Sequence, residues 1–355
     1  MSTSSLTAFT IQFNRITPIP IVVLGCMGNI LNILVFTRQR LIKNPCSTYF
    51  LCSSIANLIV LIFGLVSRFF SDGLGIDPVS TNLGFCRFRY FILHCSMVLS
   101  SWFTILAGID RYWISSRNVQ RRQLSNLKNA CYLVILTTLI GVTLYSHVLI
   151  LFTIEQLKSG PYCYAQTGIY RIFYDLFYVT TFALIPPTMM IIVGLATVYQ
   201  IRRSRLNIQP LTINNNTNVN QLKKRDRQLL KMTLVQFIFI IIVTSPIAVQ
   251  KLYATFTQNV IKGAFQLALE NFLAQLMRML VYINSSTSFY VFFATGHGFR
   301  CEFDQFIVKI IGCLCGRHTR LHRRAQIFFG DSSITQRGTM NQSVTILNHH
   351  QSMTI

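Results

Sequence analysis

Seven long apolar stretches constrain this chain more than any other feature. They occupy residues 18–36, 49–69, 85–109, 130–152, 173–199, 229–253 and 267–293. Each has about 20 residues or slightly more, the length that a helix needs to cross roughly 30 Å of hydrocarbon. A membrane barrel would need strands of about 10 residues with alternating polarity, and no such alternation is present. The pattern predicts an all-α membrane protein, a bundle of seven transmembrane helices.

Composition agrees with a lipid environment. Of 355 residues, 52% are hydrophobic and only 12% are charged, and the mean hydropathy is +0.47. A water-soluble domain of this composition would expose too much apolar surface. The first apolar stretch is too long for a signal-peptide core and has no basic region before it, so we interpret it as the first span.

Positive charge predicts the orientation in the membrane. The net charge is +22, and most of it lies in the first, third and fifth connections and in the carboxyl-terminal region. By the positive-inside rule these segments are cytoplasmic, which places the amino terminus outside a plasma-membrane protein. A basic cytoplasmic face is expected to contact anionic lipid rather than nucleic acid. Examples are Arg38, Lys43, Arg117, Arg121, Arg122, Arg202, Arg203, Arg227 and Arg300.

Cysteine placement tests this topology. Four of the ten cysteines fall inside spans, and four others fall on the cytosolic side, where thiols stay reduced. Only Cys86, at the outer end of the third span, and Cys163, in the connection between the fourth and fifth spans, remain outside. The sequence therefore predicts a disulfide between Cys86 and Cys163.

Several motifs occur in an order that resembles the rhodopsin-like (class A) G-protein-coupled receptors, over about residues 16–316. In that family a cysteine begins the third helix and an Asp-Arg-Tyr triplet ends it, as Cys86 and residues 110–112 do here. Prolines interrupt the fifth and sixth helices of the family, and each removes a backbone hydrogen bond and permits a hinge. The matching residues here are Gly28 and Asn29 in the first span, Asp110, Arg111 and Tyr112 in the third, Pro186 or Pro187 in the fifth, and Pro246 in the sixth.

The resemblance implies a receptor that couples to a heterotrimeric G protein through Arg111. Adjacent Asp110 is expected to hold this guanidinium, because a cation near hydrocarbon is expensive to leave unpaired. Asp226 matches the acid that locks the arginine in the resting state; the alternative is a solvated acid within the basic run 223–227. Val119 matches an apolar position that enters a pocket on the G protein, or it is an ordinary loop valine.

The flanking segments complete the expected domain organisation. Residues 1–16 form a Ser/Thr-rich extracellular leader, expected to be disordered, and residues 17–296 form the seven-transmembrane domain. Residues 297–316 match the short amphipathic eighth helix of the family, with Cys313 and Cys315 either palmitoylated or free cytosolic thiols. Residues 317–355 form a disordered cytoplasmic tail whose phosphorylation by receptor kinases would recruit arrestin.

Three departures from the family pattern concern activation. Asn57 stands where the family usually carries a sodium-binding aspartate, the sixth helix lacks the usual tryptophan before Pro246, and residues 288–292 replace Asn-Pro-x-x-Tyr. We therefore expect no sodium modulation and an activating relay built from other side chains. A chemosensory receptor, or a decoy receptor that binds without signalling, remains an alternative.

Candidate ligand residues lie in the outer half of the predicted bundle. Leu93 and Tyr282 replace the residues that bind amines and retinal in the family, so neither ligand is expected. Four further residues suggest a ligand with a carboxylate or an acidic peptide, because buried cations need a partner. They are Arg68, His94, Lys251 and Arg278. The alternative is that Arg68 and Arg278 reach the interface or pair with Asp175 and Glu270. His94 is expected to be hydrogen-bonded rather than a metal ligand.

Two other protein classes are disfavoured. The spans contain neither paired aspartates nor a zinc-binding His-Glu-x-x-His motif, so we expect no intramembrane enzyme, metal or cofactor. The halves of the chain lack the similarity that a secondary transporter would show. The residues around Gly28-Asn29, Asn44-Pro45 and Phe299-Arg300 are similar to those of invertebrate FMRFamide-like peptide receptors, which favours a small extracellular peptide as ligand.

Overall fold

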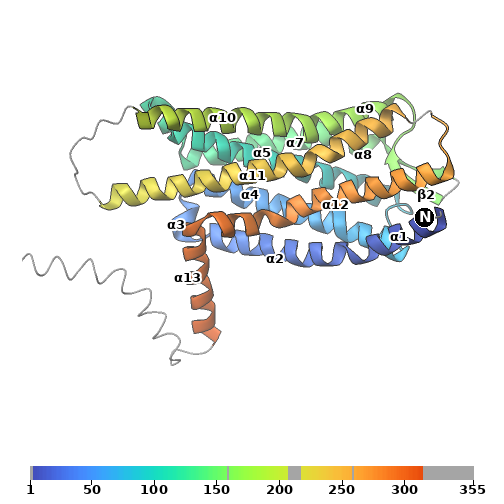
Figure 1. Ribbon diagram of the computed structural model, residues 1–355, viewed down its shortest axis with the longest axis horizontal. Helices are drawn as coiled ribbons and strands as arrows, with labels where there is room; N and C mark the ends of the chain where they lie inside the picture. The colour runs from blue at the N-terminus through green and yellow to red at the C-terminus, as the bar shows by residue number, and fades with distance from the viewer. Residues whose placement is uncertain (1–2, 158–159, 207–216, 258–259, 315–355) are drawn as a thin grey trace, which may run out of the picture. The chain divides into compact units, whose positions relative to one another are not determined.

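The computed structural model describes residues 3–157, 160–206, 217–257 and 260–314, and its long helices run side by side (Figure 1). Each of the seven expected spans lies within one of these helical segments, apart from Phe152, the last residue of the fourth. The segments are α1 (Thr3–Ile16) with α2 (Pro18–Phe36); α4 (Pro45–Val60) with the π-helices η1 (Leu61–Val66) and η2 (Phe69–Gly73); α5 (Leu83–Ile114); α7 (Leu127–Tyr145) with α8 (Val148–Leu151); α9 (Ile169–Tyr178) with π-helix η3 (Val179–Leu184) and α10 (Ile185–Leu206); α11 (Thr217–Phe256); and α12 (Ala264–Thr295). The short helices α3 (Gln39–Ile42) and α6 (Val119–Leu124) lie in connections.

Helix α12 differs from the other spans in polarity. Six of the described segments are long and apolar enough to cross a membrane, whereas α12 has 32 residues but a more polar sequence. Its polar residues are buried against neighbouring helices: Asn29 of α2 donates to the Ser285 carbonyl at 2.9 Å, and the Ser288 hydroxyl donates to Asn29 Oδ1 at 3.2 Å. These partners replace water, which is absent from hydrocarbon. The fully buried Asn29 is therefore a structural link between the first and seventh spans.

Proline shapes two of the spans. Pro246 lies inside α11, where its missing N–H leaves the Ile242 carbonyl without its usual helical donor. The Ser245 hydroxyl donates to that carbonyl at 3.2 Å and so restores one bond. Pro186 and Pro187 lie at the start of α10, directly after η3. Both predicted proline sites therefore lie where the helix is irregular or lacks a backbone hydrogen bond.

The expectation of a disordered leader is wrong for residues 3–16, the part of it that the structure describes. Residues Thr3–Ile16 form α1, whose Phe9 and Phe13 rings both pack on Phe272 of α12, with centroids 5.5 and 5.8 Å apart. Arg15 Nε donates to the Gly73 carbonyl at 3.1 Å. Phe9 and Phe13 are four residues apart, so they share one helix face, and their contact with α12 stabilises a segment whose composition looks like a linker.

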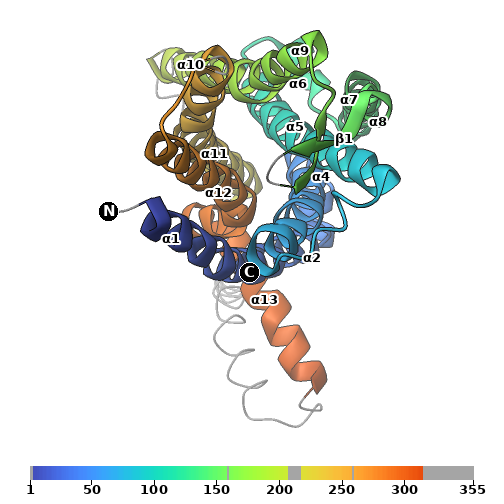
Figure 2. The same ribbon diagram turned by 90° about the vertical axis from the view of Figure 1, so that its right-hand side faces the viewer.

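A β-hairpin, which the sequence reasoning did not anticipate, follows the fourth span. Strands β1 (Phe152–Leu157) and β2 (Gly160–Ala165) pair antiparallel, and the predicted Cys86–Cys163 disulfide, with Cα atoms 6.0 Å apart, attaches β2 to the start of α5. Arg87 Nε also donates to the Phe152 carbonyl at 2.9 Å. Figure 2 looks onto this end of the bundle and shows β1 beside α5. We call it the disulfide end, and the opposite end, at Asp110 and Arg111, the Arg111 end.

The chain divides into two compact units, residues 1–298 and 299–355. The expected eighth helix is present as α13 (His297–Leu314). The side chain of Cys313, together with Cys315 and residues 317–355, lies outside the described part of the chain.

Close contact between the first span, the second and α12 requires glycine at residue 25. A Cβ added to Gly25 would lie 2.5 Å from Ser286 Cβ and 2.6 Å from Leu61 Cδ1. We predict that Gly25→Ala lowers the free energy of unfolding by about 1–3 kcal/mol, because the added methyl group overpacks this contact. Thermal unfolding of the purified protein in detergent measures the effect.

Gly194→Ala is the matched control. A Cβ at Gly194 would meet Leu234 Cδ2 at 3.5 Å, an ordinary contact, so alanine there should leave the unfolding temperature unchanged or raise it. Equal unfolding temperatures for the two variants would contradict the packing described here.

Candidate functional site

The carboxyl-terminal end of α5 holds a buried ion cluster centred on Arg111. The Arg111 side chain is only 2% exposed, and its Nη2 donates to Asp110 Oδ2 at 2.5 Å. Its Nη1 donates to Asp226 Oδ1 of α11 at 3.0 Å. The structure thus brings Asp226 to Arg111, as the locking hypothesis requires, and places a cation with two carboxylates where an unpaired charge would be costly.

Asn44 is a third partner of Arg111 that sequence reasoning missed. Arg111 Nη2 donates to Asn44 Oδ1 at 3.2 Å, and the same oxygen accepts from the Cys46 backbone N–H at 3.0 Å. Asn44 is the N-cap of α4 and Pro45 is its first residue, a helix-start signal visible in the sequence. The cluster therefore joins α4, α5 and α11 through one guanidinium.

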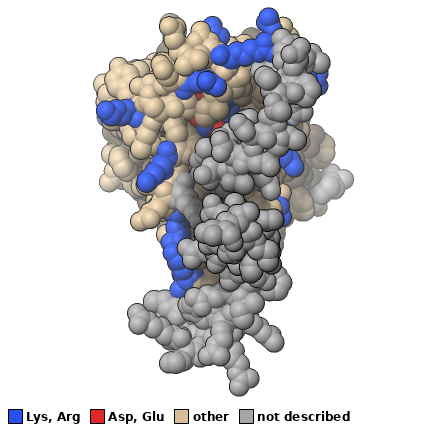
Figure 3. Space-filling model, turned by 90° about the vertical axis from the view of Figure 1, so that its left-hand side faces the viewer, with Lys and Arg blue, Asp and Glu red and all other residues tan. Residues whose placement is uncertain are grey.

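Residues beside the cluster shape the surface of the Arg111 end. The second oxygen of Asp110 accepts from Ser125 Oγ at 2.5 Å, and the Tyr112 hydroxyl accepts from Arg121 at 3.2 Å. Val119 begins α6 and is 55% exposed, although it is apolar. Figure 3 shows Lys and Arg side chains over this face. Among its exposed basic residues are Arg117, Arg121, Arg122, Arg202 and Arg203.

A cavity of about 80 Å³ lies at the disulfide end. All six residues that the sequence proposed for ligand binding line this cavity: Arg68, Leu93, His94, Lys251, Arg278 and Tyr282. They come from the second, third, sixth and seventh spans. The structure therefore brings the whole predicted set together in one place.

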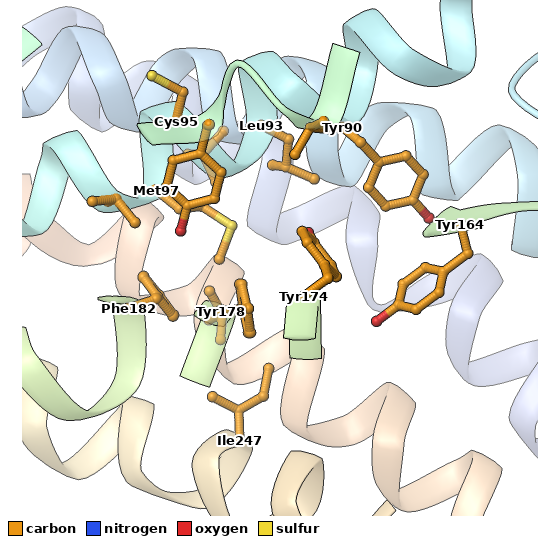
Figure 4. Close-up of a cluster of buried hydrophobic side chains, with 14 of the residues drawn as sticks. Tyr90, Leu93, Cys95, Met97, Tyr164, Tyr174, Tyr178, Phe182 and Ile247 are labelled. Carbon is orange, nitrogen blue, oxygen red and sulfur yellow. The ribbon is translucent and has the colours of Figure 1, made fainter. Parts of the chain in front are cut away.

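Tyrosines and a further arginine line the same cavity and were not anticipated. The tyrosines are Tyr90, Tyr162, Tyr164, Tyr174 and Tyr178. In Figure 4 the rings of Tyr90, Tyr164 and Tyr174 are neighbours, drawn from three different segments of the chain. Arg89 is 3% exposed and donates from Nε to the Phe63 carbonyl at 3.0 Å and to Ser67 Oγ at 2.6 Å. The four-residue spacing of Arg89, Leu93 and Met97 on α5 would have identified this helix face.

Of the two acids that the sequence offered as partners for the cavity cations, Asp175 pairs with one of these cations and Glu270 does not. Arg68 pairs with Asp72 at 2.8 Å, one helical turn away. Lys251 pairs with Asp175 at 3.2 Å. The alternative in which Arg68 and Arg278 pair with Asp175 and Glu270 is therefore wrong, because partners on the same helix or on a facing one lie closer.

Glu270 and Arg278 do not pair with each other. Glu270 pairs with Lys262 at 2.5 Å, and neither residue lines the cavity. Within the described residues, Arg278 has no carboxylate within 4.0 Å, and its buried Nε has no hydrogen-bond partner. Arg89 also has no carboxylate within 4.0 Å among these residues, but its Nε and Nη2 donate to neutral acceptors. Among the described residues, Arg278 is therefore the lining arginine with neither a carboxylate partner nor an acceptor for its Nε.

Aromatic and hydrogen-bonding contacts fix two further polar side chains of the cavity. The His94 ring is hydrogen-bonded, with Nδ1 2.8 Å from the Tyr90 carbonyl and Nε2 3.0 Å from the Tyr174 hydroxyl. The Tyr164 hydroxyl donates to Asp175 at 2.5 Å. Burial and the neighbouring Asp175 carboxylate raise the pKa of the Tyr164 phenol well above its ordinary value, so Tyr164 remains a neutral donor.

Neutral polar groups, rather than an aspartate, occupy the middle of the second and third spans. Asn57 is buried, and its Oδ1 accepts from Ser100 Oγ at 2.7 Å. Ser53 Oγ is 3.0 Å from the same Ser100 oxygen. These side chains hydrogen-bond to one another, and none of them carries a negative charge.

Comparison with known proteins identifies similarity over most of the bundle. The sequence model of the family described as "7 transmembrane receptor (rhodopsin family)" matches residues 28–287. A similar curated protein is "Melatonin receptor type 1C" of Gallus gallus, 28% identical over 151 residues. That alignment covers 41% of this chain and 41% of the relative. The matched range includes the Arg111 cluster and every residue that lines the cavity.

The disulfide generates a prediction about the cavity end. Cys86→Ser should lower the free energy of unfolding by about 2–5 kcal/mol, because it releases the hairpin from α5 and lengthens the unconstrained loop. Thermal unfolding measures the loss, and mass spectrometry of a non-reduced digest identifies the Cys86–Cys163 peptide pair in the parent protein.

Cys131→Ser is the control, since Cys131 is an exposed thiol outside the disulfide. Its unfolding temperature should match that of the parent. Equal stability of Cys86→Ser and Cys131→Ser, or alkylation of both Cys86 and Cys163 without reductant, would contradict the disulfide.

Proposed function

The chain belongs to the rhodopsin family of seven-transmembrane receptors, and on this basis we propose that it binds an extracellular ligand in the disulfide-end cavity and activates a heterotrimeric G protein at its Arg111 end. The two sites lie at opposite ends of one helix bundle. A signal between them therefore has to travel along the spans.

The proposed orientation places the Arg111 end in the cytoplasm of a cell with the receptor in its plasma membrane. The exposed arginines of α6 and α10 lie at this end, and basic residues favour the cytoplasmic side. The disulfide lies at the other end, where an extracellular location supplies oxidising conditions. Both observations support the same direction of insertion.

The observation that carries the proposed mechanism is the Arg111–Asp226 ion pair. Asp110 lies next to Arg111 on α5 and moves with it, whereas Asp226 lies on α11. Outward movement of α11 would break the second pair alone. Because the Asp226 side chain is 37% exposed, water can solvate its carboxylate once the ion pair opens. The free-energy cost of breaking the pair is therefore moderate. Opening would expose a groove for a helix of the G protein, beside the exposed Val119.

An apolar cluster supplies a relay in place of the missing tryptophan. Phe237 and Ile240 of α11 pack with Ile105 of α5 and Met190 of α10, and all four are buried. Further along α11, Ile247 and Lys251 line the cavity, beyond Pro246. A ligand that shifts the cavity end of α11 would therefore move this cluster and the Asp226 end of the same helix.

A small peptide is the proposed ligand. The cavity volume of about 80 Å³ is far below the roughly 300–1,000 Å³ of sites that enclose a whole small molecule. One side chain or one chain end fits, and the rest of a peptide would lie over the hairpin. Because a relative is named for melatonin, a ligand screen should include melatonin beside a peptide library.

A decoy receptor of the same fold is the second candidate, favoured by the absence of the usual tryptophan and Asn-Pro-x-x-Tyr residues. It would bind ligand at the disulfide end without nucleotide exchange. If the receptor signals, we propose that receptor kinases and arrestin act on the Ser/Thr-rich tail at 317–355, which lies outside the described residues.

Nucleotide exchange on a purified G protein tests the signalling proposal. Asp226→Asn should raise ligand-independent exchange a few-fold, because it removes the ion pair that holds α11 to α5, and Arg111→Ala should abolish ligand-dependent exchange. Both variants should be compared with the parent at equal surface expression and over a panel of G-protein subtypes.

Lys231→Gln is the control on the same helix, since it changes an exposed charge five residues from Asp226. Its exchange rate should equal that of the parent. Ligand binding with no exchange in the parent or in Asp226→Asn would contradict the signalling proposal and favour the decoy receptor.

A further inference from the structure

The cavity contains more positive charge than the chain compensates. Four of the described cations line it: Arg68, Arg89, Lys251 and Arg278. Arg68 pairs with Asp72, and Lys251 pairs with Asp175. Within the described residues, Arg89 donates only to neutral oxygens of the second span. Arg278 faces the same cavity with no carboxylate within 4.0 Å in the described part of the chain, and its Nε is buried without a hydrogen-bond acceptor. A guanidinium within a span is costly without a counterion, so this site is complementary to an anion.

Lys251 can change partners because its ion pair borders the cavity. Its Nζ lies 3.2 Å from Asp175 Oδ1 and donates to the Tyr164 hydroxyl at 2.8 Å. Lys251 and Asp175 remain 25% and 14% exposed, unlike the buried Arg111 and Asp110. The pair joins α11 to α9, and a flexible lysine stem lets the ammonium move without movement of the backbone.

Aromatic walls restrict what can accompany the anionic group. The Lys251 ammonium lies 5.3 Å from the centre of the Tyr164 ring and 5.9 Å from that of Tyr178. Tyr90 and Tyr174 extend the same wall (Figure 4). Such rings favour a planar or apolar group beside the charge.

We propose that the cavity binds the carboxylate of an organic acid or of a peptide chain end between Arg278 and Lys251, in competition with Asp175 for the Lys251 ammonium. This rests on the cavity being the receptor's ligand site and adds the chemical class of the ligand. Binding exchanges one carboxylate for another at Lys251, with no covalent change, and breaks the ion pair that joins α11 to α9. Binding of the ligand carboxylate and loss of this ion pair are then one event.

Matched acids and amides test the proposal on the purified full chain, without a G protein. The probes are phenylacetate with phenylacetamide, phenylpropionate with phenylpropionamide, and the peptide Phe-Met-Arg-Phe as free acid and as amide. Affinity is measured by thermal unfolding against probe concentration and by saturation-transfer nuclear magnetic resonance. At least one acid should bind about tenfold more tightly than its amide, a difference equivalent to about 1.4 kcal/mol. A preference among the organic acids alone, or for the peptide acid, identifies which source of carboxylate the cavity accepts.

Three variants separate this mechanism from general attraction of anions. Arg278→Gln should remove the preference for the acid, because it removes the lining cation whose Nε has no acceptor within the described residues. Asp175→Asn should tighten acid binding several-fold, because it removes the internal competitor for Lys251. Glu270→Gln is the matched control, since Glu270 pairs with Lys262 outside the cavity, and its affinities should equal those of the parent.

A structural role for Arg278 would give a different result. If Arg278→Gln lowers the unfolding temperature and leaves the ratio of acid to amide affinity unchanged, the arginine supports the fold and the proposal is overturned. Equal binding of acids and amides, no binding by any acid at millimolar concentration, or weaker acid binding by Asp175→Asn would also overturn it. None of these outcomes bears on nucleotide exchange, so a failure here is distinguishable from a failure of the signalling proposal.

Discussion

Burial of the Arg111 guanidinium is the constraint on which the Arg111 end of the bundle depends. A charge with 2% exposure requires partners whose attraction offsets a desolvation cost of several kcal/mol. Asp110, Asp226 and Asn44 supply them from α5, α11 and α4. Since Asn44 also caps α4, the guanidinium is bonded both to the start of the second span and to α11.

Helix α11 connects this cluster with the cavity. Asp226 and Lys251 lie 25 residues apart on it, about 38 Å at 1.5 Å per residue, and each forms an ion pair with another helix. Between them lie Pro246 and the buried residues Phe237 and Ile240. One helix held at both ends by ion pairs, with weakened backbone bonding between, is a physical basis for coupling two distant sites.

Sequence reasoning succeeded where one physical rule acts alone. Hydrocarbon thickness sets the length of the spans, compartment chemistry selected Cys86 and Cys163, and the cost of an unpaired guanidinium pointed from Arg111 to Asp110. Asp226 was found through the resemblance to the receptor family. It failed where tertiary contact overrides local composition. The polar leader folds as α1 because Phe9 and Phe13 meet Phe272 of α12. Arg68 and Lys251 take Asp72 and Asp175 as partners because of helix register and facing, which spacing along the chain did not reveal.

The central claim is that the Arg111–Asp226 pair holds α11 against α5. Pulsed electron paramagnetic resonance between spin labels at residues 128 and 231, both exposed near the Arg111 end, measures the position of α11 directly. The labels are placed in a background that keeps Cys86 and Cys163 and replaces the other cysteines. The account predicts one narrow distribution of distances when Asp226 is present, and a second, longer distance when it is replaced by asparagine. The same narrow distribution in both proteins would contradict it.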